Sequence, residues 1–319
     1  MPSPPGGRTF VVGVDLGGTW VRAGLADSSG EVRRRSRART MALEGPDRVL
    51  AQIGELVRQL VTLEPQVRLD RLVLAVGVPG PVNCEAGVVD GAPNLPGWRQ
   101  VAVRARLEEA LGCTCLVEHD VSLAALAEHR LGAGRGTDDF VYVTVSTGIS
   151  AGMILGGRLY RGHRGSAGEF GHTVMAPDGP LCNCGNRGCL EALASGVAIA
   201  RDAGMTSASE VTRLAEAGDR KAQAVLARAA RHLALALGGL INLLNPEVLA
   251  LGGGVIASSP HLFADVLAGI QDATFPSLRG SCLVQRAELG EDQGLLGAVG
   301  MALDFARHRS GLPAELTPS

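Results

Sequence analysis

The sequence predicts an α/β protein with two related halves. Stretches rich in β-branched residues alternate with segments of helical apolar spacing along the chain. A strand, a Thr/Gly turn and a second strand occupy residues 10–26, and the same pattern returns at 140–155, about 130 residues later. An internal duplication would place one copy at the head of each half. The alternative is a chance likeness between two hairpins, which are common.

The elements follow this pattern in order. Three strands open the chain as a meander, so the glycine turn near residue 17 leads from strand to strand. A dinucleotide-binding glycine loop leads from strand into helix, and the connectivity therefore excludes a nicotinamide site. The expected strands are 10–15, 20–26, 31–37, 72–76, 115–117, 140–145, 151–155 and 248–251, and the expected helices are 48–63, 101–111, 120–131, several across 191–245, and one from about 260.

Composition narrows the classes of protein. The 319 residues suit two domains, and 46% hydrophobic residues supply a packed core. A net charge of −2 shows no excess of basic residues of the kind that binds nucleic acid or an anionic membrane. Apolar runs are interrupted well before about 18 residues, so no membrane-spanning helix is expected. The first ten residues lack a signal-peptide pattern, and we expect a cytoplasmic protein with reduced thiols.

Lysine usage restricts the chemistry further. Lys221 is the single lysine among 30 basic residues. No P-loop motif occurs, and no strand lysine of the protein-kinase type is present. If this protein handles phosphates, it must use backbone N–H groups, metal ions and arginines.

The two Thr/Gly turns are candidate phosphate loops. Consecutive N–H groups without Cβ bulk can surround phosphate oxygens, and a threonine hydroxyl adds a donor. An aspartate at the end of the first strand can hold Mg²⁺, usually through water. The alternative is an ordinary hairpin turn, but a third glycine cluster at 252–254 favours a nucleotide site. The candidates are Asp15, Gly17, Gly18 and Thr19 in the first turn, and Thr147 and Gly148 in the second.

A metal signature occupies residues 172–189. His172, Cys182, Cys184 and Cys189 supply three thiolates and one imidazole, which make a closed tetrahedral zinc set. No position remains for water, so the zinc is expected to be structural. Free buried cysteines are the alternative.

Three carboxylates stand out by their positions. Asp120 precedes an apolar-periodic helix, where it would be either an N-cap or a general base fixed by the helix start. Glu169 lies three residues before one metal ligand, and Glu191 lies two residues after another. The metal loop would hold both glutamates in place to accept hydrogen bonds from sugar hydroxyls. Solvated surface glutamates are the alternative.

Together these motifs resemble the ROK family of bacterial sugar kinases and related repressors. The resemblance runs from about residue 10 to 302, and its most specific part is the cysteine motif in register with ExGH. The matching segments are DLGGT (15–19), GVPGPV (77–82), NLPGW (94–98), ExGH (169–172), CxCGxxGCxE (182–191), LGGG (251–254) and GLLGA (294–298). The family implies a two-lobed, ribonuclease-H-like fold of the actin, hexokinase and Hsp70 ATPase type, with duplicated α/β lobes around a cleft. We expect the smaller lobe at 1–119 plus about 300–319, and the larger lobe at 120–299.

The resemblance also implies roles for individual residues. Asp120 looks like the base that takes the proton from the sugar hydroxyl, and His172 would serve both zinc and sugar. The family residue before the base is usually Asn, so His119 is a departure that could change the hexose preference. The second phosphate loop also departs from its usual glycine-rich form at Ser150 and Ala151. The implied hexose contacts are Gly80, Asn94, His119, Asp120, Glu169, His172 and Glu191, and the implied adenosine-side contacts are Gly253 and Gly254.

The function implied is ATP-dependent phosphorylation of a hexose, glucose at O6 first, with Mg²⁺ and one structural Zn²⁺. N-acetylglucosamine, N-acetylmannosamine, mannose, fructose and allose are competing substrates. The family suggests a homodimer acting in carbohydrate metabolism and glycolysis. Two rivals remain: a sugar-responsive repressor, for which we expect no DNA-binding domain before residue 10, and a catalytically silent sugar-binding protein.

Overall fold

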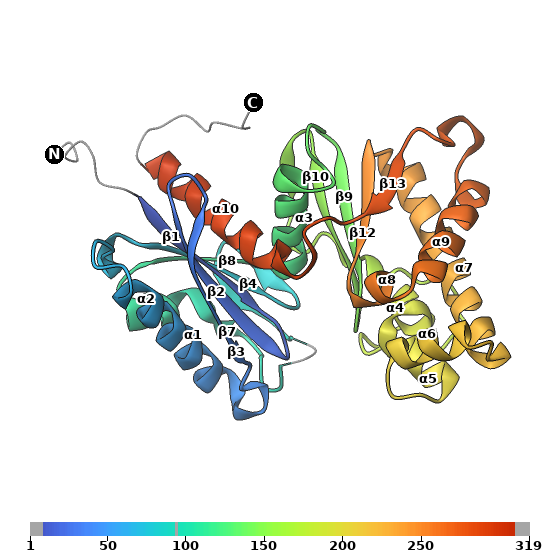
Figure 1. The fold of residues 1–319 in the computed structure, drawn as a ribbon, viewed down its shortest axis with the longest axis horizontal. Helices are drawn as coiled ribbons and strands as arrows, with labels where there is room; N and C mark the ends of the chain where they lie inside the picture. Colours follow the sequence, from blue (N-terminus) through green and yellow to red (C-terminus); the bar gives the residue numbers. More distant parts are fainter. Residues whose placement is uncertain (1–8, 93–94, 310–319) are drawn as a thin grey trace. The chain divides into compact units, whose positions relative to one another are not determined.

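The computed structural model describes residues 9–92 and 95–309. They form two compact units (Figure 1). The first unit comprises the described residues up to 130, with 161–167 and those from 291 onward. The second comprises 131–160 and 168–290. Each unit is built around a five-stranded sheet with helices packed on it.

The two main sheets have the same strand order and the same strand directions. In each sheet, the central strand is antiparallel to the strand that follows it in the chain and parallel to the neighbour on its other side. This shared arrangement confirms the predicted duplication. The first sheet runs β3 (Val32–Arg39), β2 (Trp20–Asp27), β1 (Phe10–Leu16), β4 (Val73–Val78) and β8 (Thr114–His119). The second runs β11 (Arg158–Tyr160), β10 (Ile149–Leu155), β9 (Phe140–Val145), β12 (Val248–Gly252) and β13 (Leu283–Arg286). A small sheet of β5 (Val82–Asn83), β6 (Val88–Val89) and β7 (Val101–Ala102) belongs to the first unit.

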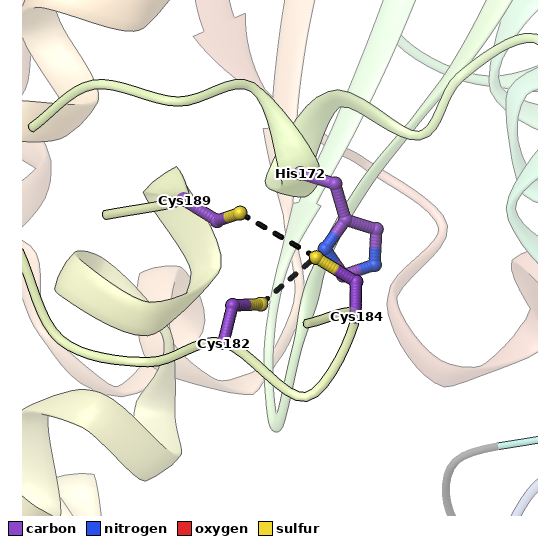
Figure 2. A group of neighbouring side chains, drawn as sticks. All are labelled: His172, Cys182, Cys184 and Cys189. Carbon is purple, nitrogen blue, oxygen red and sulfur yellow. Dashed lines mark hydrogen bonds between the residues drawn. The ribbon is translucent and has the colours of Figure 1, made fainter. Parts of the chain in front are cut away.

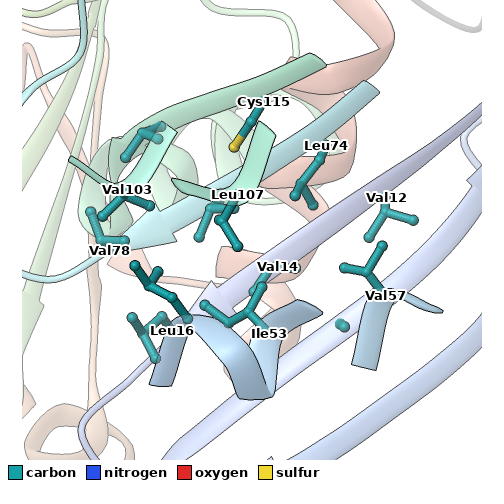
Figure 3. Close-up of a cluster of buried hydrophobic side chains, with 14 of the residues drawn as sticks. Val12, Val14, Leu16, Ile53, Val57, Leu74, Val78, Val103, Leu107 and Cys115 are labelled. Carbon is teal, nitrogen blue, oxygen red and sulfur yellow. The ribbon is translucent and has the colours of Figure 1, made fainter. Parts of the chain in front are cut away.

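Successive side chains of β1 point to opposite faces of the first sheet, and both faces are buried. Val12, Val14 and Leu16 share one cluster with residues of α1 (Gly45–Thr62) and α2 (Val103–Leu111), shown in Figure 3. Val11, one residue out of phase, lies in the opposite cluster with α10 (Gln293–Arg309). A Cβ added at Gly13 would lie 2.7 Å from the Val299 nitrogen, so the glycine permits this close approach of helix and strand.

Helix α3 (Asp120–Leu131) groups mainly with the first unit. Its Leu123 is fully buried in the cluster that contains Val11 and Val299. The boundary therefore differs from the sequence expectation, which begins the second lobe at residue 120. The cause is packing, because Leu123 of α3 is buried in one cluster with residues of β1, β4 and α10.

The second unit is rich in helices. Helix α7 (Arg220–Leu244) is 25 residues long, and its most apolar window, of mean hydropathy 1.4, meets the length and composition of a membrane span. That window is 56% buried in the protein, and α7 packs against α6 and α9, so its apolarity is that of a core helix. The other helices are α4 (Leu190–Ala194), α5 (Gly196–Ala203), α6 (Ala208–Glu216), α8 (Gly254–Ser258) and α9 (Pro260–Ala273). Short 3₁₀ helices span Ala42–Glu44, Leu69–Arg71, Phe170–His172, Pro276–Leu278 and Gly290–Asp292.

Candidate active site and metal centre

The first Thr/Gly turn joins β1 to β2 in the first unit. The Gly17 N–H donates to the Trp20 carbonyl at 2.9 Å and closes the turn. Thr40, just after β3, donates its N–H to the Thr19 carbonyl and its hydroxyl to the Gly17 carbonyl. The turn is therefore held from two sides, while Thr19 itself is exposed and able to meet a ligand.

Asp15 lies at the end of β1 with an unusual electrostatic environment. Burial and the charge of Asp120 raise its pKa from 3.8 to about 6, and Arg22 partly opposes this rise. Arg22 lies directly across the hairpin and approaches the carboxylate to 3.5 Å. Carboxylate oxygens are hard donors of the kind that Mg²⁺ prefers, and a bound cation would offset the charge that Asp120 adds near Asp15. The chemistry of these residues therefore fits the predicted metal.

His119 ends β8, and Asp120 is the first residue of α3. The Asp120 Oδ1 accepts the Val121 N–H at 2.7 Å, so the carboxylate is directed by the helix start. The His119 Nε2 lies 3.4 Å from the same oxygen. Burial raises the Asp120 pKa, and the His119 charge lowers it. The Asp120 side chain is 37% exposed, so a ligand can reach it.

Glu118 is a buried neighbour of Asp120 that the sequence did not single out. Its side chain is 1% exposed and pairs with the Arg161 Nε at 2.6 Å. The other carboxylate oxygen accepts the His119 N–H at 3.0 Å and the Cys84 thiol at 3.1 Å. Burial and Glu118 raise the Cys84 pKa to about 12, so the thiol keeps its proton. Glu118 thus fixes the end of β8, from which Asp120 follows.

The second Thr/Gly turn joins β9 to β10 in the second unit. The Ser146 N–H donates to the Gly148 carbonyl at 2.8 Å, and Thr147 is exposed. Gly253, with φ +89°, packs so tightly that an added Cβ would lie 2.7 Å from the Thr144 hydroxyl oxygen. Gly254 begins α8 directly after it. The structure therefore brings the predicted residues 147–148 and 253–254 to the same end of the second sheet.

Glu191 lies in α4 and points at this turn. Its Oε2 accepts the Ile149 N–H at 2.9 Å, and a Cβ added at Gly148 would overlap the same oxygen. Glu191 is half-buried and hydrogen-bonded, unlike a freely solvated surface glutamate.

Glu169 follows a glycine that is clamped onto β10. The Gly168 carbonyl accepts the Ala151 N–H at 2.9 Å and the Ser150 hydroxyl at 3.1 Å. Ser150 and Ala151 are the departures in the second loop, and here they anchor the segment that precedes Glu169. The Glu169 Oε2 lies 3.7 Å from the His172 Nε2.

His172, Cys182, Cys184 and Cys189 converge as the sequence predicts (Figure 2). Their ligand atoms all lie within 4.8 Å of one another. The Cys182 sulfur lies 3.5 Å from the His172 Nδ1, and the Cys184 and Cys189 sulfurs are 3.6 Å apart. Zn–S bonds of about 2.3 Å place two tetrahedral sulfurs about 3.8 Å apart, so this cluster fits a zinc ion. Nδ1 faces the thiols, which leaves Nε2 toward Glu169, as is common for metal-bound histidines.

Gly80 and Asn94 are the other two residues predicted to contact the hexose. Gly80, with φ +88°, packs against the Gly91 carbonyl, and an added Cβ would lie 3.1 Å from the Ala92 Cα. Asn94 lies outside the described residues. Arg22 and Glu118, which sequence reasoning missed, are recognised only once the strands are paired.

The two sheets share one topology, and each has a Thr/Gly turn between the two strands that come first in the chain. This arrangement defines an α/β protein of the actin, hexokinase and Hsp70 type. The model of the ROK family matches residues 11–304. The chain belongs to the ROK family.

Its relatives include sugar kinases. A glucokinase of Thermotoga maritima is 34% identical over 307 residues, covering 90% of this chain and 95% of the relative. The solved ROK hexokinase of Thermus thermophilus has a TM-score of 0.82 and 38% identity, covering 94% of this chain and all of that one. A Streptomyces griseus ROK glucokinase, solved with glucose and AMPPNP, has a TM-score of 0.79 and 30% identity, covering 94% and 99%.

Proposed function

We propose that this protein is a sugar kinase that transfers the γ-phosphoryl group of ATP to a hexose, with glucose as the preferred acceptor. The observation that carries this proposal is the Asp120 carboxylate, which the start of α3 orients and which a ligand can reach. It lies in the same unit as Asp15 and the first Thr/Gly turn. The kinship with glucokinases and with a glucose-bound and AMPPNP-bound relative supports the choice of substrates.

Asp120 would accept the proton of the sugar hydroxyl as that oxygen bonds to the γ-phosphorus and ADP leaves. The Gly18 N–H and the hydroxyls of Thr19 and Thr147 would donate to phosphate oxygens, while the Gly17 N–H closes the turn. Mg²⁺, held near Asp15, would neutralise charge on the phosphates. Most of the acceleration would come from positioning, since phosphoryl transfer needs little covalent help from the protein.

Glu169 and Glu191 would accept hydrogen bonds from hydroxyl groups, and His172 would present the edge of its ring that the metal leaves free. The zinc would be structural, because four protein ligands leave no open position. Gly80, Asn94 and His119 are the other sugar contacts that the family resemblance implies. We further propose a cytoplasmic homodimer that acts in carbohydrate metabolism.

The test is ADP release with a panel of hexoses. We expect release that depends on glucose and yields glucose 6-phosphate, with weaker responses to N-acetylglucosamine, N-acetylmannosamine, mannose, fructose and allose. Binding of a hexose without ADP release would instead favour a silent sugar-binding protein. A stronger response to another hexose would support the kinase activity but show that glucose is not the preferred acceptor.

A further inference from the structure

Strand β3 carries five exposed arginines that differ in how their charges are balanced. Arg33 pairs with Asp27, Arg34 with Glu64 and Arg35 with Asp292, at 2.7–3.0 Å. In the described part of the chain, no carboxylate pairs with Arg37 or Arg39 at ion-pair distance. Their guanidinium groups lie over the Trp20 ring instead, 5.2 and 5.1 Å from its centre.

This Arg37–Trp20–Arg39 cluster is continuous with the first Thr/Gly turn. Trp20 directly follows Thr19 and pairs with Arg39 across the strands. Thr40, the next residue, donates the two hydrogen bonds that hold the turn at Gly17 and Thr19. The cluster is therefore joined to the turn by chain continuity, by strand pairing and by these two hydrogen bonds.

The cluster also lies on the sheet face that carries Asp15. Register places Arg22 opposite both Asp15 and Arg37, and cross-strand partners project from the same face. Arg37 and Arg39 are two residues apart on one strand, about 7 Å between their Cα atoms. Two like charges are thus held near each other, beside the residues that would meet the phosphates.

Guanidinium groups suit phosphate because their planar donors match its oxygens in pairs. The aromatic ring limits the motion of both arginines, which lowers the entropy lost when they bind a ligand. The chain has no lysine here, so arginines are its available fixed cations for this task.

We propose that Arg37 and Arg39, held by Trp20, bind phosphate groups of a linear phosphate chain that extends past the Gly17–Thr19 turn. The ligand chemistry is shared by a nucleoside triphosphate and by an inorganic polyphosphate. The location rests on the proposed function, which puts the donor phosphates at this turn. The alternative is that the arginines only protect an edge strand from pairing with other chains.

The experiment measures binding of inorganic triphosphate, which requires no catalysis. Titration calorimetry at two salt concentrations would compare the wild-type chain with Arg37→Gln/Arg39→Gln. The matched control is Arg33→Gln/Arg34→Gln, which removes the same charge from the same strand. Trp20 also offers an optical signal, because the second tryptophan, Trp98, is 1% exposed, and Trp20→Phe identifies the source of any change.

We expect the Arg37/Arg39 variant to bind triphosphate about tenfold more weakly at low salt, with a shallower salt dependence, and the control to bind like wild type. Parallel titrations with ATP and with long-chain polyphosphate identify the natural source, while AMP, which lacks the chain, should show little dependence on the arginines. The proposal would be overturned if the two variants bound triphosphate equally well or if the wild-type protein did not bind it. It would also be overturned if the Arg37/Arg39 variant aggregated but kept its affinity for triphosphate. If triphosphate binding needs the arginines but the protein releases no ADP, the proposed kinase activity is wrong and the proposed phosphate site still holds.

Discussion

Glu191 Oε2 and the Ile149 backbone nitrogen are joined by a hydrogen bond of 2.9 Å. Glu191 lies two residues after the metal ligand Cys189, and Ile149 directly follows Gly148 of the second turn. One side chain therefore links the metal loop to the turn that would meet phosphate. If Glu191 also contacts the hexose, binding of sugar and of nucleotide to this unit are coupled through it.

Gly148→Ala tests this coupling. The added methyl group would overlap the Glu191 carboxylate and displace it from Ile149. We expect steady-state kinetics to show higher KM values for both the hexose and ATP, by severalfold each. Gly239→Ala is the control, since nothing lies within 4 Å of its added Cβ and it sits inside α7. A change in the KM of ATP alone would separate Glu191 from the sugar.

Local patterns in the sequence predicted much of this molecule. Helix α3 begins and ends where the apolar spacing predicts, and the four metal ligands lie within one short loop, so their spacing predicts their convergence. The pairs made by Glu118 join residues 34 and 43 positions apart, and no local pattern reveals them. The same is true of Glu191 and Ile149, 42 positions apart. Short edge strands such as β11 and β13 also lack a sufficient apolar run to be predicted.

Asp120→Asn should nearly abolish turnover while hexose binding persists. The amide keeps an oxygen that can accept the Val121 N–H but cannot take up a proton, and a general base contributes about 10²–10⁴-fold to rate. Coupled ADP release gives the rate, and calorimetry gives the sugar affinity. Asp70→Asn, at an exposed residue, serves as the control. Turnover within a fewfold of wild type would remove Asp120 from the role of base.

His119→Asn should shift the acid side of the pH–rate profile. The base works when ionised, so activity falls as the pH drops through the Asp120 pKa. Burial raises that pKa and the charge of His119 lowers it, so loss of the imidazole should raise it. We expect the acid limb of kcat/KM to move to higher pH in the variant. An unmoved or lowered limb would contradict the electrostatic link between the two residues.

Asp15→Asn should stabilise the fold near pH 8 but not near pH 4. The Asp15 pKa is raised from 3.8 to about 6 in the folded protein, so its ionised form is disfavoured by folding. That penalty is absent below the unfolded pKa, grows as the pH rises, and is complete above about pH 6. A shift of this size corresponds to a gain of roughly 2–3 kcal/mol at pH 8. Denaturant unfolding without Mg²⁺ at the two pH values measures it, and an equal effect at both would contradict the assignment.

Cys184→Ser should remove the metal and loosen the segment that carries Glu169 and Glu191. Elemental analysis of the wild-type protein is expected to give one zinc per chain, because the four ligand atoms lie within 4.8 Å of one another. Since a structural zinc contributes folding free energy directly, the variant should lose the ion, melt at a lower temperature and bind hexose more weakly. Cys282→Ser, at a thiol outside the cluster, is the control and should keep both zinc and sugar affinity. A wild-type protein free of transition metal that still binds hexose at full strength would show that the cysteine loop holds its shape by packing alone.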